Sequence, residues 1–205
     1  MRQPSRPAGV PALSDPPPAA RKVVLHVGCG FGGGRLHSHF QESEWREIRL
    51  DIDPGVRPDI VASMTSMEAV AGNTIDGIWS SHNLEHLHHH EVALALGEFF
   101  RVLKPRGLLL LALPDLQRIA ELVAADRLDD TAYMSPSGPI TPLDMIFGHS
   151  PSLARGNHFM AHKTGFTPTT LLKALVHAGF VDILLRRGND FDLWGRAYKP
   201  AARAD

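Results

Sequence analysis

The strongest constraint on the fold is a short apolar run that ends in a cluster of glycines. Residues 23–27 read Val-Val-Leu-His-Val, and glycines follow at positions 28, 30 and 32–34. Such a run predicts a buried parallel strand that feeds a tight turn, where missing side chains let the backbone approach a bound ligand closely. We therefore expect a nucleotide-like ligand at this turn.

A second predicted strand ends in carboxylates. The residues Ile48-Arg49-Leu50 lead into Asp51-Ile52-Asp53-Pro54. An acidic side chain at this place in an open α/β sheet can accept hydrogen bonds from both hydroxyls of a ribose. The glycine spacing alone leaves two cofactor classes open. Positions 28, 30 and 33 fit a nicotinamide-dinucleotide fingerprint, and positions 28, 30 and 32 fit the turn of S-adenosylmethionine (SAM) enzymes.

Length and composition exclude several classes of protein. A chain of 205 residues can form one well-buried domain but is too short for a dinucleotide domain with a separate substrate domain, which argues against a conventional dehydrogenase. The net charge of −1 provides no overall attraction to nucleic acid or to an anionic membrane. The single cysteine, Cys29, rules out an internal disulfide framework and favours a reducing, cytoplasmic environment. No apolar run approaches the length of about 20 residues that spans a bilayer.

Two segments differ from the rest of the chain. Residues 1–21 are rich in proline and poor in apolar residues, so we expect a disordered arm that lacks the apolar core of a signal peptide. Residues 22–200 are expected to form a single domain. Within it, residues 128–165 contain aromatic, methionine and histidine side chains, which predict an ordered lid over an acceptor pocket. The apolar residues of this segment could alternatively form a homodimer contact.

Predicted strands and helices alternate through the middle of the chain. Strands are expected at residues 58–64, 74–81 and 108–113, a short helix at 35–40, and longer helices at 91–103 and 116–125. The residues Lys104-Pro105-Arg106-Gly107 are expected to stop the first of the longer helices. Alternation of this kind predicts a parallel sheet with helices on both faces.

The end of the chain predicts a different connection. Thr167-Pro168 is a typical helix start, with a capping hydroxyl followed by proline. The two strands that follow, at 181–186 and 191–198, are joined by so short a turn that they must form an antiparallel hairpin. The predicted fold is therefore α/β: a Rossmann-like, doubly wound, mostly parallel seven-stranded sheet with a C-terminal antiparallel hairpin.

Four blocks of sequence, in a fixed order, carry a family resemblance. The blocks are His26-Val27-Gly28-Cys29-Gly30, Leu50-Asp51-Ile52-Asp53-Pro54, Ser80-Ser81-His82-Asn83-Leu84-Glu85-His86-Leu87 and Glu98-Phe99-Phe100-Arg101-Val102-Leu103-Lys104-Pro105-Arg106-Gly107. Residues 22–199 resemble the class I SAM-dependent methyltransferases, specifically the small type 11-like group. A parallel sheet finished by an antiparallel hairpin is a feature of the same class. Arg106 departs from the family, which usually has a second glycine there, in a turn remote from the expected cofactor site.

The resemblance implies which residues contact the cofactor. The backbone at Gly28, Cys29 and Gly30 would pack against the methionine part of SAM, and Asp51 would bind the ribose hydroxyls, with Asp53 as the competing ribose ligand. Other implied contacts are Ile52 over the adenine, Ser63 and Met64 at the adenine edge, and Ser81, His82 and Asn83 beside the methionine and the transferred methyl group. A plain core position is an equally good interpretation of Met64.

The acceptor side depends on proton transfer. SAM carries an activated methyl group, so the protein has to align the acceptor and, for a hydroxyl or a protonated amine, remove a proton. Histidine suits this task at neutral pH, and the chain has twelve. His86, His158 and His162 are the expected catalytic residues, each with a structural role as its alternative. Asp115, Tyr133 and His149 are expected to contact the acceptor, with Asp115 facing the pocket from the end of the fifth strand.

The spacing of His82, His86 and His90, one residue in every four, suggests a metal site. Imidazoles one helical turn apart can chelate zinc or nickel. However, the first of these residues falls in a predicted loop, and no His-Glu-x-x-His motif or cysteine cluster accompanies them. We therefore expect solvated histidines and no metal.

The leading hypothesis is a SAM-dependent methyltransferase that methylates an oxygen or nitrogen atom of a small molecule or saccharide-type intermediate and releases S-adenosylhomocysteine (SAH). No nucleic-acid or membrane partner is expected. Alternatives are a methyltransferase acting on a macromolecule, a non-catalytic binding or assembly module with the same fold, and a small NAD-binding domain.

Overall fold

A computed structural model describes residues 21–31 and 36–202 of the chain. The predicted disordered arm lies outside these residues, apart from Arg21, and so do Gly32, Gly33 and Gly34 of the glycine cluster. Within the described part, no helix has both the length and the apolar character needed to cross a bilayer.

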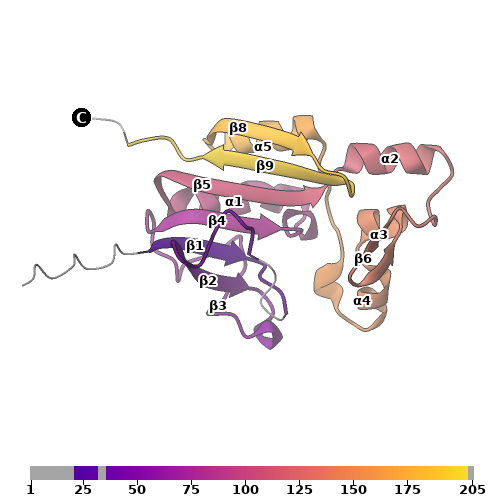
Figure 1. The fold of residues 1–205 in the computed structure, drawn as a ribbon, viewed down its shortest axis with the longest axis horizontal. Coiled ribbons are helices and arrows are strands. Elements are labelled where there is room, and N and C mark those ends of the chain that lie inside the picture. Colours follow the sequence, from indigo (N-terminus) through magenta and orange to yellow (C-terminus); the bar gives the residue numbers. More distant parts are fainter. Residues whose placement is uncertain (1–20, 32–35, 203–205) are drawn as a thin grey trace, which may run out of the picture.

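The centre of the fold is a seven-stranded sheet with the order β3-β2-β1-β4-β5-β9-β8 (Figure 1). Its strands are β1 (Lys22–Val27), β2 (Trp45–Asp51), β3 (Ile60–Val61), β4 (Ile75–Ser81), β5 (Leu103–Pro114), β8 (Val181–Arg187) and β9 (Asp192–Tyr198). Strands β1 to β5 pair in parallel, and β9 pairs antiparallel with both β5 and β8. This arrangement confirms the predicted mostly parallel sheet with a C-terminal hairpin.

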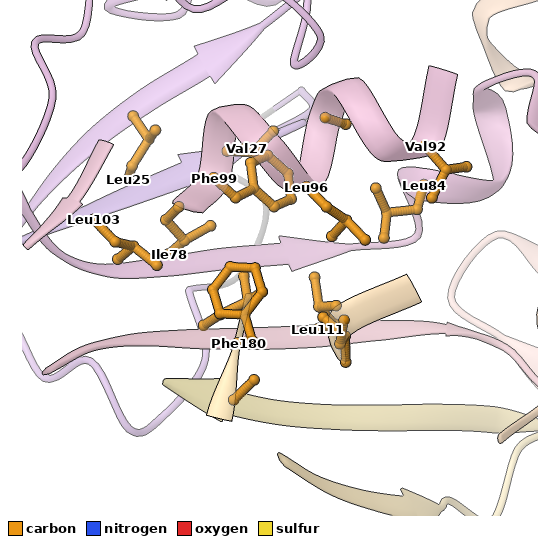
Figure 2. Close-up of a cluster of buried hydrophobic side chains, with 14 of the residues drawn as sticks. Leu25, Val27, Ile78, Leu84, Val92, Leu96, Phe99, Leu103, Leu111 and Phe180 are labelled. Carbon is orange, nitrogen blue, oxygen red and sulfur yellow. The ribbon is translucent and has the colours of Figure 1, made fainter. Parts of the chain in front are cut away.

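Helices α1 (Val92–Val102) and α5 (Pro168–His177) pack against one face of the sheet. Leu96 and Phe99 of α1 and Leu171 of α5 belong to one buried cluster with Leu111 of β5 (Figure 2). As predicted, α5 begins at a Thr167 cap, whose hydroxyl accepts a hydrogen bond from the Thr170 N–H at 3.3 Å. Burial of these apolar side chains holds the sheet and both helices together as one unit.

The opposite face of the sheet is covered mainly by aromatic side chains. Phe40, Trp45 and Trp79 are buried there, and Trp194 stacks on Trp79 with ring centroids 5.8 Å apart. The short helix predicted at 35–40 does not form, because the described residues 36–40 adopt turns. Instead, the Phe40 ring fills the space beside Gly77, where a Cβ would come within 2.8 Å of it.

Strand β5 begins at Leu103 rather than at the predicted Leu108, so the Lys104–Gly107 stretch lies in the strand. The N–H of Arg106 donates to the carbonyl of Lys199 at 3.0 Å, which ties this edge to the chain after β9. Arg106 has a φ of 64°. This left-handed conformation favours glycine, which gives a physical reason for the glycine expected at this position.

The 128–165 segment contains regular structure beyond the carboxyl ends of the parallel strands (Figure 1). Helix α2 (Leu116–Ala124) leads into it. Its elements are β6 (Tyr133–Ser135), β7 (Gly138–Ile140), α3 (Pro142–Phe147), α4 (Ser150–Ala154) and a 3₁₀ helix at His158–Met160. Ile119, Ile140 and Met145 form a small core of their own. The Lys163 N–H donates to the Glu85 carbonyl at 2.8 Å, so the end of the segment is held against the loop after β4.

Candidate functional site

A cavity of about 420 Å³ lies at the carboxyl ends of β1, β2 and β4. Ligands of open α/β sheets bind at this edge, where the strand order reverses, and the volume falls in the usual range for small-molecule sites. Except for Cys29, every predicted cofactor residue lines this cavity: Gly28, Gly30, Asp51, Ile52, Ser63, Met64, Ser81, His82 and Asn83.

The two described glycines of the turn make room for different neighbours. Gly28 and Gly30 both have a φ of +64°. A Cβ on Gly30 would meet no atom of the described residues within 4 Å, so this position opens into the cavity. A Cβ on Gly28 would lie 1.8 Å from Oδ1 of Asn83. Gly30 therefore leaves space for a ligand, whereas Gly28 leaves space for Asn83.

Asn83 connects the ends of two strands at the cavity wall. Its Nδ2 donates to the carbonyls of Val27 and Ser81, each at 2.9 Å. These bonds tie the end of β1 to the end of β4. Cys29, in contrast, lies off the wall: its side chain is buried, and burial raises the pKa of its thiol. The sequence-based prediction for Cys29 concerns its backbone, which lies in the turn between Gly28 and Gly30, so the buried side chain leaves that prediction untested.

The carboxylate of Asp51 holds the turn and still faces the cavity. Oδ2 accepts a hydrogen bond from the Gly30 N–H at 2.9 Å, and Oδ1 accepts one from the Asp53 N–H at 3.0 Å. Each carboxylate oxygen retains a second lone pair for a ligand hydroxyl. Asp53 also lines the cavity, but its Oδ1 accepts from the Gly55 N–H at 2.7 Å and caps the 3₁₀ helix Pro54–Val56.

Apolar side chains form another part of this cavity. Ile52 and Phe31 are 50% and 67% exposed, and both line it. Met64 lines the cavity and also packs against the main core. The Ser63 hydroxyl accepts a hydrogen bond from the Thr65 N–H at 3.2 Å. Phe31 was not predicted, although an exposed aromatic residue directly after Gly30 is a signal that the sequence contains.

A smaller cavity of about 150 Å³ shares His82, His86 and Met160 with the larger one. Its remaining wall comes from the 128–165 segment, from the end of β5 and from the start of β9: Pro114, Tyr133, Ile140, Asp144, Met145, His149, His162, Asp190, Phe191 and Asp192. The predicted residues Tyr133, His149, His86 and His162 therefore face one space. Ionisable groups from three parts of the chain meet there.

His82 lies at the boundary between the two cavities, between two carboxylates. Its Nδ1 is 3.4 Å from Oε1 of Glu85, and its Nε2 is 3.5 Å from Oδ1 of Asp192. Burial opposes the charged imidazolium, but Asp192 and Glu85 outweigh burial and raise the pKa of His82 to about 10. Burial likewise favours the neutral acid of Glu85, but His82 and the other nearby histidines lower its pKa overall. At neutral pH this is a charged pair.

Tyr133 and Asp144 give the smaller cavity a donor and a negative charge. Burial, together with the charges of Asp192, Asp190 and Asp144, raises the pKa of Tyr133 to about 12, so its hydroxyl stays protonated. Burial disfavours the charged form of Asp144, but hydrogen bonds from Ser150 and Thr141 lower its pKa overall. The bonds with Thr141 form the capping box of α3.

Known proteins share this architecture. A SAM-dependent methyltransferase structure from Methanosarcina mazei superposes with a TM-score of 0.61 at 18% identity, covering 89% of this chain and 94% of that one. Phosphoethanolamine N-methyltransferase 2 from Haemonchus contortus, in complex with SAM, has a TM-score of 0.56 at 13% identity over 88% of this chain and 49% of its own. At these identities the similarity shows a common fold.

Sequence comparison adds a curated relative and a family. The malonyl-[acyl-carrier protein] O-methyltransferase of Methylovorus sp. (strain MP688) is 29% identical over an alignment of 132 residues, and the match covers 55% of this chain and 43% of that protein. This chain thus spans less than half of that relative. The family described as "Methyltransferase domain" matches residues 25–111, which include the glycine turn, Asp51 and Asn83. Together these findings support a class I SAM-dependent methyltransferase of the type 11 group.

Two residues expected on the acceptor side of this methyltransferase fold lie elsewhere. Asp115 is fully buried: its Oδ1 accepts from the Gln117 N–H at 3.2 Å, and its Oδ2 lies 2.8 Å from Nε of Arg187. It does not face the pocket, because α2 starts directly after β5 and uses this carboxylate as its cap. His158 is exposed in its 3₁₀ helix and lines neither cavity, so its expected catalytic role has no support from the position of its side chain.

Sequence reasoning also missed residues of the smaller cavity, among them Asp144, Met160 and Asp192. A signal for Asp192 was available. The predicted antiparallel hairpin brings the start of β9 beside the end of β5, and the structure pairs Asp192 with Pro114. Asp144 and Met160 had no comparable signal, because their positions depend on the packing of the 128–165 segment.

Proposed function

We propose that this chain transfers a methyl group from SAM to an oxygen or nitrogen atom of a small-molecule or saccharide-type acceptor. One observation carries the proposal: the cavity that contains the glycine turn and Asp51 meets a second cavity, lined by ionisable side chains, at His82 and His86. Cofactor and acceptor would therefore approach each other at this shared wall.

The residues of the larger cavity fit SAM. The open space at Gly30 admits a ligand close to the backbone, and the free lone pairs of Asp51 suit ribose hydroxyls. Exposed Ile52 and Phe31 offer apolar surface to a planar base. When bound, the cofactor supplies an electrophilic methyl group on a sulfonium, so the protein has to position the acceptor and manage its proton.

The smaller cavity could perform that positioning. The protonated Tyr133 hydroxyl can donate a hydrogen bond to an acceptor, and the carboxylates of Asp144 and Asp192 can accept one. Burial lowers the pKa of His162, so its imidazole is neutral at pH 7 and can take a proton from the acceptor. The 128–165 segment supplies most of this wall, which supports its predicted role as a lid that excludes water.

The size of the smaller cavity supports a small acceptor over a macromolecule. The name of the curated relative, an O-methyltransferase, supports oxygen as the accepting atom. A cytoplasmic location and a homodimer contact through the 128–165 segment remain predictions from the sequence.

The first test is calorimetry of the purified protein with SAM, SAH and NAD. We expect micromolar binding of SAM and SAH and no binding of NAD. Transfer of labelled methyl from SAM to a panel of hydroxyl, carboxyl and amine compounds, including nucleotide sugars, then tests the acceptor class. Binding of NAD alone would contradict the proposal. Binding of SAH without transfer to any compound would favour the non-catalytic module, and transfer only to protein or RNA would favour a macromolecular acceptor.

A further inference from the structure

The loop after β4 and the end of the 128–165 segment bring together three side chains that could share one cation. Glu85, His86 and His162 each offer a ligand atom, and these atoms all lie within 4.8 Å of one another. The two segments are joined by hydrogen bonds on both sides of the cluster. Lys163 N–H donates to the Glu85 carbonyl at 2.8 Å, and Nδ1 of His86 donates to the Ala161 carbonyl at 3.1 Å. The cluster is therefore built into the backbone structure.

The hydrogen bonds of both histidines determine which ring nitrogen is available. Nδ1 of His86 contacts the carbonyl of Ala161, and Nδ1 of His162 contacts the carbonyl of Met145 at 2.9 Å. A carbonyl oxygen only accepts, so each Nδ1 carries the hydrogen and each neutral ring has its lone pair on Nε2. Metal-binding histidines commonly show this arrangement, in which a bond to a carbonyl orients the ring and sets its tautomer. The two rings lie 4.9 Å apart, tilted by 64°.

The environment of the Glu85 carboxylate supports a bound cation independently of the distances within the cluster. Its side chain is 1% exposed, and neither carboxylate oxygen has a hydrogen-bond partner among the residues that the structure describes. His82 Nδ1, at 3.4 Å from Oε1, is farther away than the usual length of about 2.7–2.9 Å for a charged hydrogen bond. A buried carboxylate with unsatisfied oxygens is strongly unfavourable unless a positive group contacts it directly.

We propose that Glu85, His86 and His162 bind one divalent transition-metal ion. Two imidazoles and one carboxylate form a ligand set typical of zinc and of ferrous iron, with positions left for water or substrate. From the sequence, His82, His86 and His90 share a spacing that suits a metal, but they are expected to be solvated and to bind none. Folding instead joins His86 to its neighbour Glu85 and to His162, which is remote in sequence. Because His86 lines both cavities, the ion would lie at their boundary.

The proposal is independent of methyl transfer and concerns metal binding alone. A bound ion would occupy the same His162 nitrogen that could otherwise accept a proton, so metal ligation and the base role exclude each other at that atom. It would also replace His82 as the positive neighbour of Glu85. Metal binding is therefore expected to weaken the ion pair between His82 and Glu85.

The test is titration of chelator-treated full-length protein with Zn²⁺ by calorimetry and with Co²⁺ by visible absorption. We expect one ion per chain and a cobalt spectrum that indicates nitrogen and oxygen ligands. Glu85→Gln keeps the volume of the side chain and removes its charge, and His162→Gln removes one imidazole. Each variant should weaken Zn²⁺ binding by at least about 100-fold, since even changes to the groups that support metal ligands lower affinity by about 10- to 100-fold.

The matched control is a variant with both His88→Gln and His90→Gln. These two residues are exposed, and their rings stack with centroids 5.8 Å apart, so they test adventitious surface binding. This control should bind Zn²⁺ as the wild type does. Thermal unfolding of each variant shows whether it folds, and either Glu85→Gln or His162→Gln suffices for the test. No 1:1 binding by the wild type, undiminished binding by a folded Glu85→Gln or His162→Gln variant, or loss only in the surface control would overturn the proposal.

Discussion

Gly28 and Asn83 lie in direct contact, so that a Cβ on Gly28 would come within 1.8 Å of the Asn83 side-chain oxygen. The glycine is needed because the Asn83 amide fills the place of its missing side chain while it bonds the ends of β1 and β4. The first sequence block and the third therefore meet at one contact. A change at Gly28 should disturb the sheet edge as well as the ligand site.

Alanine at Gly28 and at Gly30 should have different effects. Both positions share the same positive φ, and strain there costs about 1–3 kcal/mol. Gly28→Ala adds overpacking against Asn83, which costs a further ~1–3 kcal/mol. Chemical denaturation should therefore show a clearly larger loss of unfolding free energy for Gly28→Ala. Gly30→Ala should mainly weaken SAH binding, because its methyl group enters the cavity. Equal losses of unfolding free energy in the two variants would contradict the contact between Gly28 and Asn83.

Asp51 rather than Asp53 should carry ribose binding. Asp51→Asn removes the charge from an acceptor that faces the cavity, and SAH affinity should fall by about tenfold, or ~1.4 kcal/mol. Asp53→Asn is the matched control, since Asp53 lines the same cavity but its Oδ1 already caps a 3₁₀ helix. Calorimetry with SAH compares the two variants. A larger loss of SAH affinity in Asp53→Asn than in Asp51→Asn would show that Asp53 is the ribose ligand.

The charge on His82 should make stability depend on pH in a defined window. The pKa of His82 rises from the ordinary 6.5 to about 10 in the folded state. The stabilisation that the charged His82 adds to the free energy of unfolding is therefore complete below pH 6.5 and disappears as the pH rises to about 10. His82→Asn removes the charge, and asparagine tolerates the left-handed φ of 52° at this position.

The measurement is the free energy of unfolding of wild type and His82→Asn between pH 6 and about pH 10. A chelator excludes any contribution from metal. The difference in the free energy of unfolding between wild type and His82→Asn should shrink as the pH rises. A difference that stays constant over this window would show that His82 is not held in its charged form.

The ion pair between Asp115 and Arg187 should stabilise the fold, and its loss should leave cofactor binding unchanged. Arg187→Met leaves a fully buried carboxylate without its cation, which should lower the free energy of unfolding by about 2 kcal/mol. Adding Asp115→Asn should recover part of this loss, because the helix cap remains while the charge is gone. SAH affinity should stay the same in both variants. Weaker SAH binding in a folded Arg187→Met variant would show that Asp115 takes part in cofactor binding.

Arg106→Gly should stabilise the protein slightly. The left-handed conformation costs about 1–2 kcal/mol at a non-glycine residue, and the extra freedom of glycine in the unfolded chain cancels part of the gain. We expect an increase of about 0.5 kcal/mol in the free energy of unfolding. Arg106→Ala, which keeps the strained conformation, is the control and should show no increase. If the free energy of unfolding rises as much in the alanine variant as in the glycine variant, relief of backbone strain is not the reason for the increase.

Most residues that line the larger cavity could be predicted because each of their signals is local. The glycine turn, Asp51 and Asn83 each follow a strand directly, and the carboxyl ends of parallel strands meet at one edge. The direction of the buried Cys29 side chain, in contrast, does not follow from the order of residues in the turn. The acceptor half was predicted only in part, since Tyr133 and His149 face the smaller cavity whereas Asp115 and His158 do not.

The sequence by itself determined the strand and helix order, the antiparallel end of the sheet and the residues around the larger cavity, because hydrophobic periodicity, caps and short turns act over a few neighbouring residues. Only the tertiary structure decided that Glu85 and His86 lie against His162, that His82 lies between Glu85 and Asp192, and that Asp115 turns inward to Arg187. Except for the neighbours Glu85 and His82, these contacts join segments distant in sequence, and they form only when the 128–165 segment and the hairpin pack against the carboxyl edge of the sheet.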